Sequence, residues 1–557
     1  MHKPTLPQDI MLLICQELGA RREFTTLYRC ALVSRRVASI AVEQLYRILD
    51  VMDPFIEGGL RAARLWRSII LSSRQATLYP YCAYTRVMSL SSLVECLDDI
   101  RLDRSLFNFF FDGPMQDFLV LQGGSASTKS LRSRPPPFNI PVIVSRCADI
   151  ITQYIQTLAD ISGTTVALTC LEDPGCPRDT LPTWIGRLGS LRSLQLRDGS
   201  ILGVEAASAI AACCPGFAEL TCFHCSSETA AEDVAAFFLA LRPNSLRKFE
   251  VLSRNTLGEV TLAALGSHAE SLRVLHLRSL LLPALKSLPL LAGCTALESL
   301  VIERETADTS GGSDGYGPAE LARVADWIAG CRGLRQLNFN HVRDALPILE
   351  RVLRAAPEMR LEQLLIQDFQ SPPEETTAAA AWGALGRQDR LELLTIAAQD
   401  GAVDGLVLGQ RPELTDSLCR LRRLTSLNLM QASVSSAEVR RLAASLPALE
   451  ELSFGGDLVD DSILGPLGGL PRLVLLSINA VTAFRFTSLQ EFARMLDPAT
   501  NRGIKVDLLN QWFEARLTED EEAWLNQYFA ANLNGRIAIS YPNDPDELHE
   551  DDFTDSD

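Results

Sequence analysis

A recurring leucine pattern constrains this chain more than any other feature of its sequence. The pattern L-x-x-L-x-L, with conservative replacements, occurs eleven times, and neighbouring starts are separated by 24 to 37 residues. Repetition at such a period predicts a stack of similar units and not several unrelated domains. The starts are Leu191, Phe217, Leu246, Leu272, Leu297, Leu334, Leu361, Leu391, Leu424, Leu449 and Leu473.

Each unit predicts a short strand followed by a helix. The last two apolar positions of the motif alternate with other residues, so they lie on one face of a strand. A segment that predicts a helix follows, and proline or glycine then ends each helix before the next strand. Capping-box pairs predict several of the helix starts. These pairs are Thr229 with Glu232, Ser435 with Glu438, Ser488 with Glu491, and Thr518 with Glu521.

These repeats resemble the leucine-rich-repeat family. The resemblance implies an α/β solenoid shaped like a horseshoe, with a parallel sheet on the concave side and helices on the convex side. We assign residues 186–541 to it. Cys214, Cys294 and Cys331 each lie three residues before a repeat start. This spacing resembles the cysteine-containing repeats that are found in many F-box proteins.

The regions flanking the regular repeats differ in composition. Residues 50–185 are expected to form a linker and irregular early repeats, with candidate strands at Tyr84–Leu90 and Thr165–Cys170. A flexible loop is expected at about 113–140, because Gly, Ser and Pro are concentrated there. Residues 542–557 are expected to form a disordered tail, since the last fourteen residues hold eight acidic and no basic side chains.

Residues 1–49 do not follow the repeat and predict a separate helical module. Pro7 and Asp9 stand in the first turn of a helix on which Ile10, Leu13, Ile14 and Leu18 share one face. A second short helix follows, and Ser34 is the expected N-cap of a third. Three short helices enclose a small core, so such a module usually depends on a partner.

The text L-P-Q-D-I-M-L-L-I-C-Q-E-L, followed by L-Y-R-C-A-L-V-S-R-R-V, resembles the F-box. In that family the matching positions form the core of the module or contact the Skp adaptor of SCF ubiquitin ligases, which links the F-box protein to a cullin. With leucine-rich repeats behind the module, the chain resembles fungal-looking F-box substrate receptors. The resemblance assigns adaptor binding to Leu6, Pro7, Ile10, Ile14, Leu27, Cys30, Val33 and Ser34.

Charge and composition exclude several classes of protein. The formal net charge is −17, from 52 basic and 69 acidic side chains, which disfavours binding to nucleic acid or anionic membranes through bulk charge. No apolar run is long enough to predict a membrane span. The fourteen cysteines are ordinary usage, and the chain has no N-x-S/T glycosylation acceptor, so we expect a cytoplasmic or nuclear protein.

The sequence carries no motif typical of catalysis. It contains no Gly-Lys pair for a phosphate-binding loop, no H-E-x-x-H and no G-x-S-x-G. Cys222 and Cys225 form a C-x-x-C, but zinc needs about four ligands and Cys222 falls on an inward repeat position. We therefore expect structural cysteines, no cofactor, no metal and no enzymatic activity of the chain's own.

The concave side of the predicted sheet is the expected target-binding surface. The third, fifth and seventh residues of each unit face it, and the middle units carry amides there. Amides donate and accept hydrogen bonds without the desolvation cost of buried charge. Basic residues of other units are expected to steer acidic or phosphorylated segments. The predicted target-binding residues are Gln336, Asn338, Asn340, Gln363 and Gln367, with Arg197, Lys248 and Arg278.

The sequence therefore favours a substrate-recognition subunit of an SCF-type E3 ubiquitin ligase. The alternative is a non-catalytic leucine-rich-repeat scaffold unrelated to ubiquitin, whose amino-terminal helices only cap the array. A third interpretation is a GTPase-activating leucine-rich protein that supplies an arginine. No arginine in the sequence stands out for that role.

Overall fold

The computed structural model describes residues 7–48, 59–122, 137–306, 316–369, 375–398, 406–509, 511–512 and 515–541. The predicted tail at 542–557 lies outside the described residues, and so do residues 123–136 of the predicted loop. The chain divides into two compact units, Met1–Leu272 and Arg273–Asp557, which are treated separately below. Among the helices in the described ranges, none is long and apolar enough to cross a membrane.

The first unit begins with helices and continues into repeats. Its helices before the regular repeats are α1 (Gln8–Ala20), α2 (Phe24–Ala31), α3 (Arg35–Ile48), α4 (Gly59–Ser73), α5 (Tyr81–Tyr84), α6 (Leu90–Leu102), α7 (Arg104–Phe110), the 3₁₀ helix η2 (Gly113–Phe118) and α8 (Ile140–Ser162). Its strands are β1 (Val87–Ser89), β2 (Cys170–Asp173), β3 (Ser193–Asp198), β4 (Glu219–His224) and β5 (Lys248–Val251). The helices between these strands and after them are α9 (Leu181–Arg187), α10 (Val204–Cys213), α11 (Ala230–Ala240) and α12 (Glu259–Leu265).

The second unit alternates strand and helix throughout. Its strands are β6 (Val274–Leu280), β7 (Ser299–Arg304), β8 (Gln336–Asn340), β9 (Gln363–Phe369), β10 (Leu393–Ala398), β11 (Leu406–Val407), β12 (Ser426–Ser433), β13 (Glu451–Val459), β14 (Leu475–Thr482), β15 (Lys505–Leu508) and β16 (Arg536–Ile539). Its α-helices are α13 (Leu282–Ser287), α14 (Pro318–Gly330), α15 (Ala345–Ala355), α16 (Glu375–Leu385), α17 (Pro412–Leu418), α18 (Ser436–Ser445), α19 (Leu464–Gly468), α20 (Phe486–Met495) and α21 (Glu519–Leu533).

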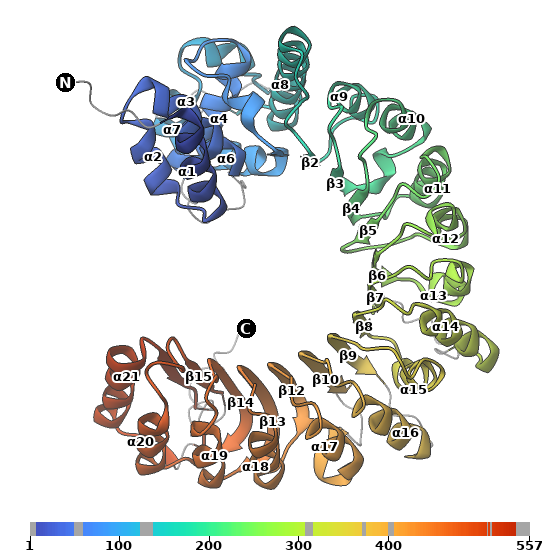
Figure 1. The fold of residues 1–557 in the computed structure, drawn as a ribbon, viewed down its shortest axis with the longest axis vertical. Coiled ribbons are helices and arrows are strands. Elements are labelled where there is room, and N and C mark those ends of the chain that lie inside the picture. The colour runs from blue at the N-terminus through green and yellow to red at the C-terminus, as the bar shows by residue number, and fades with distance from the viewer. Residues whose placement is uncertain are drawn as a thin grey trace, which may run out of the picture. The chain divides into compact units, whose positions relative to one another are not determined.

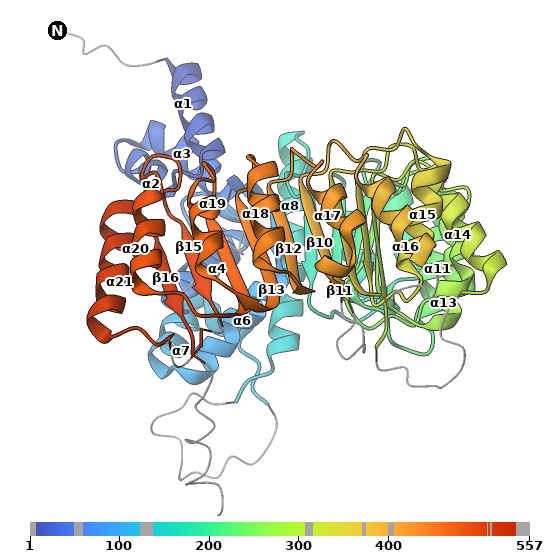
Figure 2. The ribbon, with the colours of Figure 1, turned by 90° about the horizontal axis from the view of Figure 1, so that it is seen from below.

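Both units carry parallel strands in sequence order, with helices on one face. The order is β1 to β5 in the first unit and β6 to β16 in the second, where β11 pairs with β12 beside the main path. Within the second unit, helices α14 to α21 cover one face of the strands (Figure 1 and Figure 2). The strand face opposite the helices is called the open face below. The fold is an α/β leucine-rich-repeat solenoid, as the sequence predicts.

The leucine motif builds the core in every one of its eleven occurrences. All eleven start residues are buried, and so are the residues at the fourth and sixth positions of each motif. Each strand begins two residues after the motif start, so the motif's first leucine lies before the strand and the next two lie within it. Burial of these side chains stabilises the fold by about 25 cal/mol per Å² of apolar surface. This burial is the main force that holds successive repeats together.

Two of the four predicted capping boxes form. Thr518 caps α21: its hydroxyl accepts from the backbone N–H of Glu521 at 3.3 Å, and the Glu521 carboxylate accepts from the backbone N–H of Thr518 at 2.9 Å. Ser435 and Glu438 form the second. The other two predictions are wrong. Thr229 precedes α11 without a side-chain cap, and Ser488 lies inside α20, which begins at Phe486.

Three strand and loop boundaries differ from expectation. Residues 113–118, predicted to belong to the loop at 113–140, form η2, because Met115 and Phe118 are buried. Strand β1 lies within the predicted Tyr84–Leu90. The second early strand, β2, begins at Cys170 and not at Thr165. It therefore shares only Cys170 with the predicted Thr165–Cys170.

Strands β15 and β16 were missed by the motif because their first position is not apolar. The pairing register aligns Leu475 with Lys505 and Lys505 with Arg536, so Gly503 and Asn534 stand where the motif has leucine. Both have a left-handed backbone, with φ of 84° and 50°. Glycine and asparagine adopt this conformation at little cost, unlike leucine.

Candidate protein-binding surfaces

Helices α1, α2 and α3 enclose a small apolar core. Helix α1 begins after Pro7, and Asp9 lies in its first turn, where an acidic side chain is favourable. The buried members of the core are Cys15, Leu27, Ile40 and Ala41, and the partly buried ones are Met11, Leu12, Leu18, Cys30, Ala31 and Leu45. Burial, with a smaller contribution from Cys30, raises the pKa of the Cys15 thiol, so this thiol stays protonated.

The core-facing side of α1 is not the one the sequence spacing indicated. Met11, Leu12, Cys15 and Leu18 face the core, whereas three of the four residues expected to share a face point to solvent. Ile10 is 43% exposed and Ile14 is 44% exposed, and Leu13 is also exposed. Helix α1 is therefore apolar on two sides, and only one side is covered in this structure.

The module exposes six large apolar side chains within 24 residues. They are Ile10, Leu13, Ile14, Tyr28, Leu32 and Val33. Single exposed apolar residues are ordinary on protein surfaces, but several on one small module are typical of a surface that binds a partner.

The predicted adaptor-binding residues fall into different environments. Pro7, Ile10, Ile14, Val33 and Ser34 are exposed, and the Ser34 hydroxyl accepts from the backbone N–H of Val37 at 3.3 Å at the start of α3. Leu6 lies outside the described residues.

Two of the predicted residues belong to the core instead. Leu27 is fully buried and Cys30 packs against the core. Leu27 supports the module from within, whereas Cys30 is only partly buried.

Helix α3 attaches the module to the rest of the first unit. The Tyr46 hydroxyl lies 2.7 Å from the Ser68 hydroxyl of α4, and the Tyr46 ring stacks on Tyr81 of α5 with centroids 4.6 Å apart. Burial raises the pKa of Tyr46 to about 12, although the Ser68 hydrogen bond acts in the opposite direction. Tyr46 therefore stays neutral and holds α3 in place.

The five predicted amides lie on two neighbouring strands of the second unit. Register pairs Gln336 with Gln363, and Asn340 with Gln367, on β8 and β9. Asn338 lies between the two amides of β8. The register therefore brings together all five residues that the sequence proposed for the middle of the sheet.

A hydrogen-bonded row leads into these amides. The Ser299 hydroxyl of β7 donates to Oε1 of Gln336 at 2.8 Å and accepts from Nε2 of His276 at 2.8 Å. Asn340 donates from Nδ2 to Oε2 of Glu303 at 3.2 Å. Two side-chain oxygens remain: Oδ1 of Asn338 and Oδ1 of Asn340 are buried and have no hydrogen-bond partner among the described residues. A buried carbonyl without a donor costs about 1 to 3 kcal/mol.

A close contact joins His341, which follows β8, to Asp368 of β9. Nδ1 of His341 lies 2.9 Å from Oδ2 of Asp368, and both residues have left-handed backbones, with φ of 55° and 52°. The backbone N–H of His341 donates to the Gln367 carbonyl at 3.0 Å. Such backbone conformations in residues other than glycine are uncommon and concentrate at functional sites.

The three basic residues predicted to steer the target lie on three different strands. Arg197 is exposed at the end of β3, and Lys248 at the start of β5 is paired with Glu250 at 2.8 Å. Arg278 is exposed on β6 of the second unit. Within the first unit, Arg197 and Lys248 thus lie on strands that are separated by β4.

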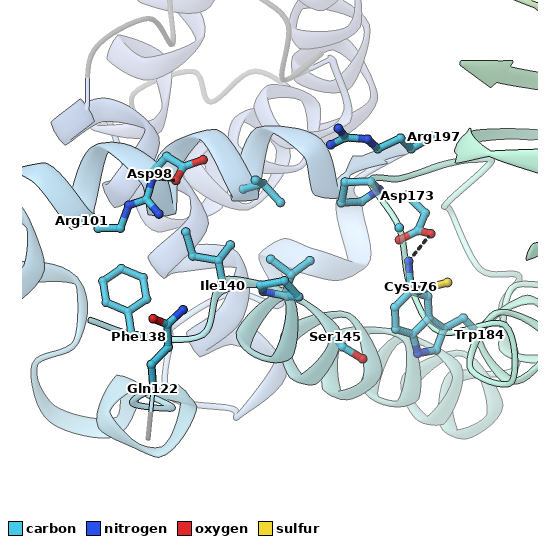
Figure 3. Close-up of a pocket in the computed structure, with 15 residues that line it drawn as sticks. Asp98, Arg101, Gln122, Phe138, Ile140, Ser145, Asp173, Cys176, Trp184 and Arg197 are labelled. Atoms are coloured by element: carbon cyan, nitrogen blue, oxygen red, sulfur yellow. Dashed lines mark hydrogen bonds and ion pairs between the residues drawn. The ribbon is translucent and has the colours of Figure 1, made fainter. Parts of the chain in front are cut away.

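Arg197 lines a pocket of about 290 Å³ in the first unit (Figure 3). Arg197 lies at one side of this pocket, and Phe138 and Gln122 lie at the other. Asp173 is buried, and its Oδ2 accepts from the backbone N–H of Cys176 at 2.8 Å. Burial raises the pKa of Asp173, and the hydrogen bonds from Cys176 oppose that shift.

The described residues contain no group of three or more His, Cys, Asp or Glu side chains placed to hold a metal ion. Cys222 and Cys225 are both fully buried. A side-chain hydrogen bond with Cys225, together with burial, raises the pKa of Cys222 well above its ordinary value. A thiol that stays protonated is a poor metal ligand and a poor nucleophile, which favours a structural role for Cys222.

A comparison with protein-family models gives no match, and a comparison with curated protein sequences gives none either. Among solved structures, the chain is similar to a Rad7 and Elc1 complex from yeast, at 18% identity over 60% of this chain and 87% of the other, with a TM-score of 0.37. An internalin from Listeria monocytogenes matches at 14% identity over 55% of this chain and 84% of the other, with a TM-score of 0.28.

The mouse RP105/MD-1 complex matches at 12% identity over 68% of this chain and 73% of the other, with a TM-score of 0.35. These likenesses are distant. The assignment to leucine-rich repeats rests on the chain's own motif and on its own strand pairing, which together indicate a protein that binds other proteins.

Proposed function

We propose that this chain is the substrate-recognition subunit of an SCF-type E3 ubiquitin ligase. Helices α1 to α3 bind a Skp-family adaptor and through it a cullin, and the open face of the repeats binds a target protein. The chain itself performs no chemistry. It holds the target within reach of the ubiquitin-conjugating enzyme, so that its contribution is proximity and orientation.

The exposed apolar side chains of the helical module carry this proposal. A module whose core holds only four fully or nearly buried side chains has little stability to spare, yet it leaves Ile10, Leu13 and Ile14 in water. Covering them against a partner removes this apolar surface from water and supports the module at the same time. An F-box meets that requirement by binding its adaptor.

The amides of β8 and β9 support the open face as the target site. Their register makes a patch that spans two neighbouring strands, and Glu303 adds an acceptor on β7. The buried Oδ1 atoms of Asn338 and Asn340 would be satisfied by N–H groups of a bound segment. We therefore place target binding over Leu334 to Gln367 within this proposal.

The proposed complex works in the cytoplasm or nucleus. The cysteines of the described residues are all free thiols, and most of them are buried. This supports a reducing compartment, where disulfides are rare.

The adaptor interaction is tested by point variants of the full chain. Ile10→Glu/Ile14→Glu places two charges on the exposed side of α1 and leaves the core residues Cys15 and Leu27 untouched. The matched control is Ile161→Glu near the end of α8, an apolar side chain that is 79% exposed. Point variants are preferable to deleting residues 1–49, because Tyr46 of α3 packs against α4 and α5.

We expect the double variant to lose most of its recovery of a purified Skp-family adaptor. Truncating an aliphatic contact at an interface centre costs over about 1 kcal/mol, so two charged replacements weaken binding by at least about 30-fold. The control should bind normally, and circular dichroism should be unchanged for both. Undiminished adaptor binding by the double variant would instead favour the scaffold alternative, in which these helices only cap the repeats.

A further inference from the structure

Arginines recur at one register position along the starting edge of the first unit's strands. The pairing of β1 to β5 aligns Val87, Cys170, Ser193, Glu219 and Lys248. The residues just before these five are Arg86, Thr169, Arg192, Ala218 and Arg247. Arginine therefore stands on every second strand, at the edge where the strands begin.

Backbone hydrogen bonds fix the spacing of this row. The Arg86 carbonyl accepts from the N–H groups of Thr169 and Cys170, and the Thr169 carbonyl accepts from those of Arg192 and Ser193. The same pattern continues through Ala218 to Arg247. Neighbouring strands lie about 4.8 Å apart, so arginines on alternate strands are about 10 Å apart.

These arginines are not neutralised by carboxylates of the described residues. Among the described residues, no carboxylate forms an ion pair with Arg86, Arg192 or Arg247, and all three are exposed. Glu219 is near them in register but makes no such pair.

In the second unit, charged residues at the corresponding edge form ion pairs. There, Arg273 pairs with Glu298 at 3.8 Å and Arg335 pairs with Glu362 at 3.3 Å. Glu392 is paired with Arg423 at 3.1 Å. The unpaired basic edge is thus specific to the first unit, and it is not a general property of these repeats.

A groove lies against this edge. Its volume is about 790 Å³, and no carboxylate lines it. Arg86 and Arg192 line it together with Arg47, whose guanidinium pairs with Glu43 at 2.9 Å while its Nε atom is buried without a described partner. Thr169 and Ser190 add hydroxyls.

The groove also offers backbone donors. The segment Thr165, Val166 and Ala167 lines it and belongs to no helix or strand. The backbone N–H groups of these three residues donate to no described group. Arginine guanidinium groups, hydroxyls and unpaired backbone N–H groups are the donors that bind phosphate groups best.

We propose that this groove binds a polypeptide segment that carries two phosphorylated side chains three residues apart. One turn of a polyproline II helix is three residues and about 9 Å long, so residues i and i+3 lie on the same side at a spacing that matches the distance between arginines on alternate strands. Arg86 and Arg192 each bind one phosphate. Arg47 and the hydroxyls of Thr169 and Ser190 line the same groove. That the segment belongs to a ubiquitination target rests on the proposed function, whereas the phosphate site does not.

The test is direct binding to the full chain by isothermal titration calorimetry at low salt. The probes are a synthetic peptide with phosphoserines at positions i and i+3, its unphosphorylated form, and inorganic pyrophosphate. Arg86→Gln/Arg192→Gln removes the two arginines of the groove. Arg64→Gln/Arg146→Gln is the charge-matched control, because both are exposed arginines of the first unit that lie on α4 and α8.

We expect the doubly phosphorylated peptide to bind the natural chain and the control, and to bind the groove variant at least tenfold more weakly. Affinity should fall steeply with salt. The proposal is overturned if the groove variant binds normally or if the unphosphorylated peptide binds equally well. Equal binding of pyrophosphate overturns the polypeptide ligand. Adaptor recovery is measured separately, so a failure here is distinguishable from a failure of the proposed function.

Discussion

Nδ2 of Asn340 lies 3.2 Å from Oε2 of Glu303, so this amide donates from β8 to β7 while its own Oδ1 remains buried without a described partner. One side of the amide thus contributes to the sheet surface, and the other has no hydrogen bond to the described residues. Asn338, on the same strand, has an Oδ1 atom in the same condition. Variants of these two asparagines therefore test whether the open face binds the target.

The first prediction concerns target capture. Replacing Asn338, Asn340 and Gln363 by alanine removes amides from β8 and β9, and we expect target capture to fall by tenfold or more, because each hydrogen bond contributes about 0.5 to 1.5 kcal/mol. Adaptor binding should not change. Affinity purification with mass spectrometry measures both. The control replaces Ser453, Ser477 and Asn479 on β13 and β14. Loss of capture by the control, with normal capture by the first variant, would assign the site to the later strands.

The second prediction separates binding from stability. Asn338→Leu removes a buried carbonyl that has no donor, so the free energy of unfolding should stay the same or rise by about 1 kcal/mol. Target capture should nevertheless weaken. Urea unfolding followed by fluorescence measures the first quantity. A loss of stability would mean that Asn338 has a structural partner, such as an ordered water, and would weaken the argument for a ligand.

The third prediction uses two asparagines of the second unit. Asn501 is buried: its Nδ2 donates to the carbonyls of Leu470 and Leu473, and its Oδ1 accepts from the backbone N–H of Asp497. Asn501→Leu leaves these groups unpaired and should lower the free energy of unfolding by about 3 kcal/mol. Asn479→Leu, at an exposed position on β14, should change it by less than about 0.5 kcal/mol. Similar midpoints for the two variants in urea would contradict the prediction.

The fourth prediction concerns pH and His268. This side chain is fully buried and donates from Nε2 to the Phe238 carbonyl at 3.2 Å. Burial lowers its pKa, although the hydrogen bond opposes the shift. The unfolded chain therefore binds a proton near pH 6.5 that the folded chain binds only at lower pH. Stability is lost as pH falls through 6.5 towards the folded pKa.

The measurement is thermal unfolding between pH 8 and pH 5. His268→Gln retains a donor for the Phe238 carbonyl but does not titrate, so the variant should lose less stability than the natural chain over this range. Parallel curves for the two proteins would show that His268 does not contribute to the acid sensitivity.

The fifth prediction compares two predicted helix caps. Thr518 accepts from the Glu521 backbone N–H at the start of α21, so Thr518→Ala should cost about 1 kcal/mol. Ser488 lies inside α20, where alanine is a better helix former, so Ser488→Ala should be neutral or slightly stabilising. The urea midpoints of the two variants test this. Equal losses would mean that Ser488 caps its helix after all.

The fold was predictable because its core repeats. Leucine-type residues at three positions of each motif specify eleven strands, and every one of those residues is buried. Strands β15 and β16 escaped because Gly503 and Asn534 replace the first leucine. Their left-handed backbones follow from turn geometry, which the motif does not encode.

The binding surfaces were predictable only in part. Register alone brought Gln336, Asn338, Asn340, Gln363 and Gln367 together, because the motif fixes which strand positions face outward. The outward side of α1 was not predictable, since Ile10 and Met11 are equally apolar and the choice depends on where α2 and α3 pack. The basic edge was missed because Arg86, Arg192 and Arg247 are far apart in sequence and meet only through the pairing of β1 to β5.

The shared register of the strands also governs how this protein can change over evolutionary time. From Leu191 onward, the two longest repeats, which start at Leu297 and Leu391, each have their strand near the beginning and extra residues before the next α-helix. Insertions in those connections leave every buried leucine in place. Deleting one residue within a strand would instead turn its apolar side chains to the opposite face. Descendants of this gene should therefore differ in length by whole repeats or within strand-to-helix connections, and rarely by single residues inside a strand.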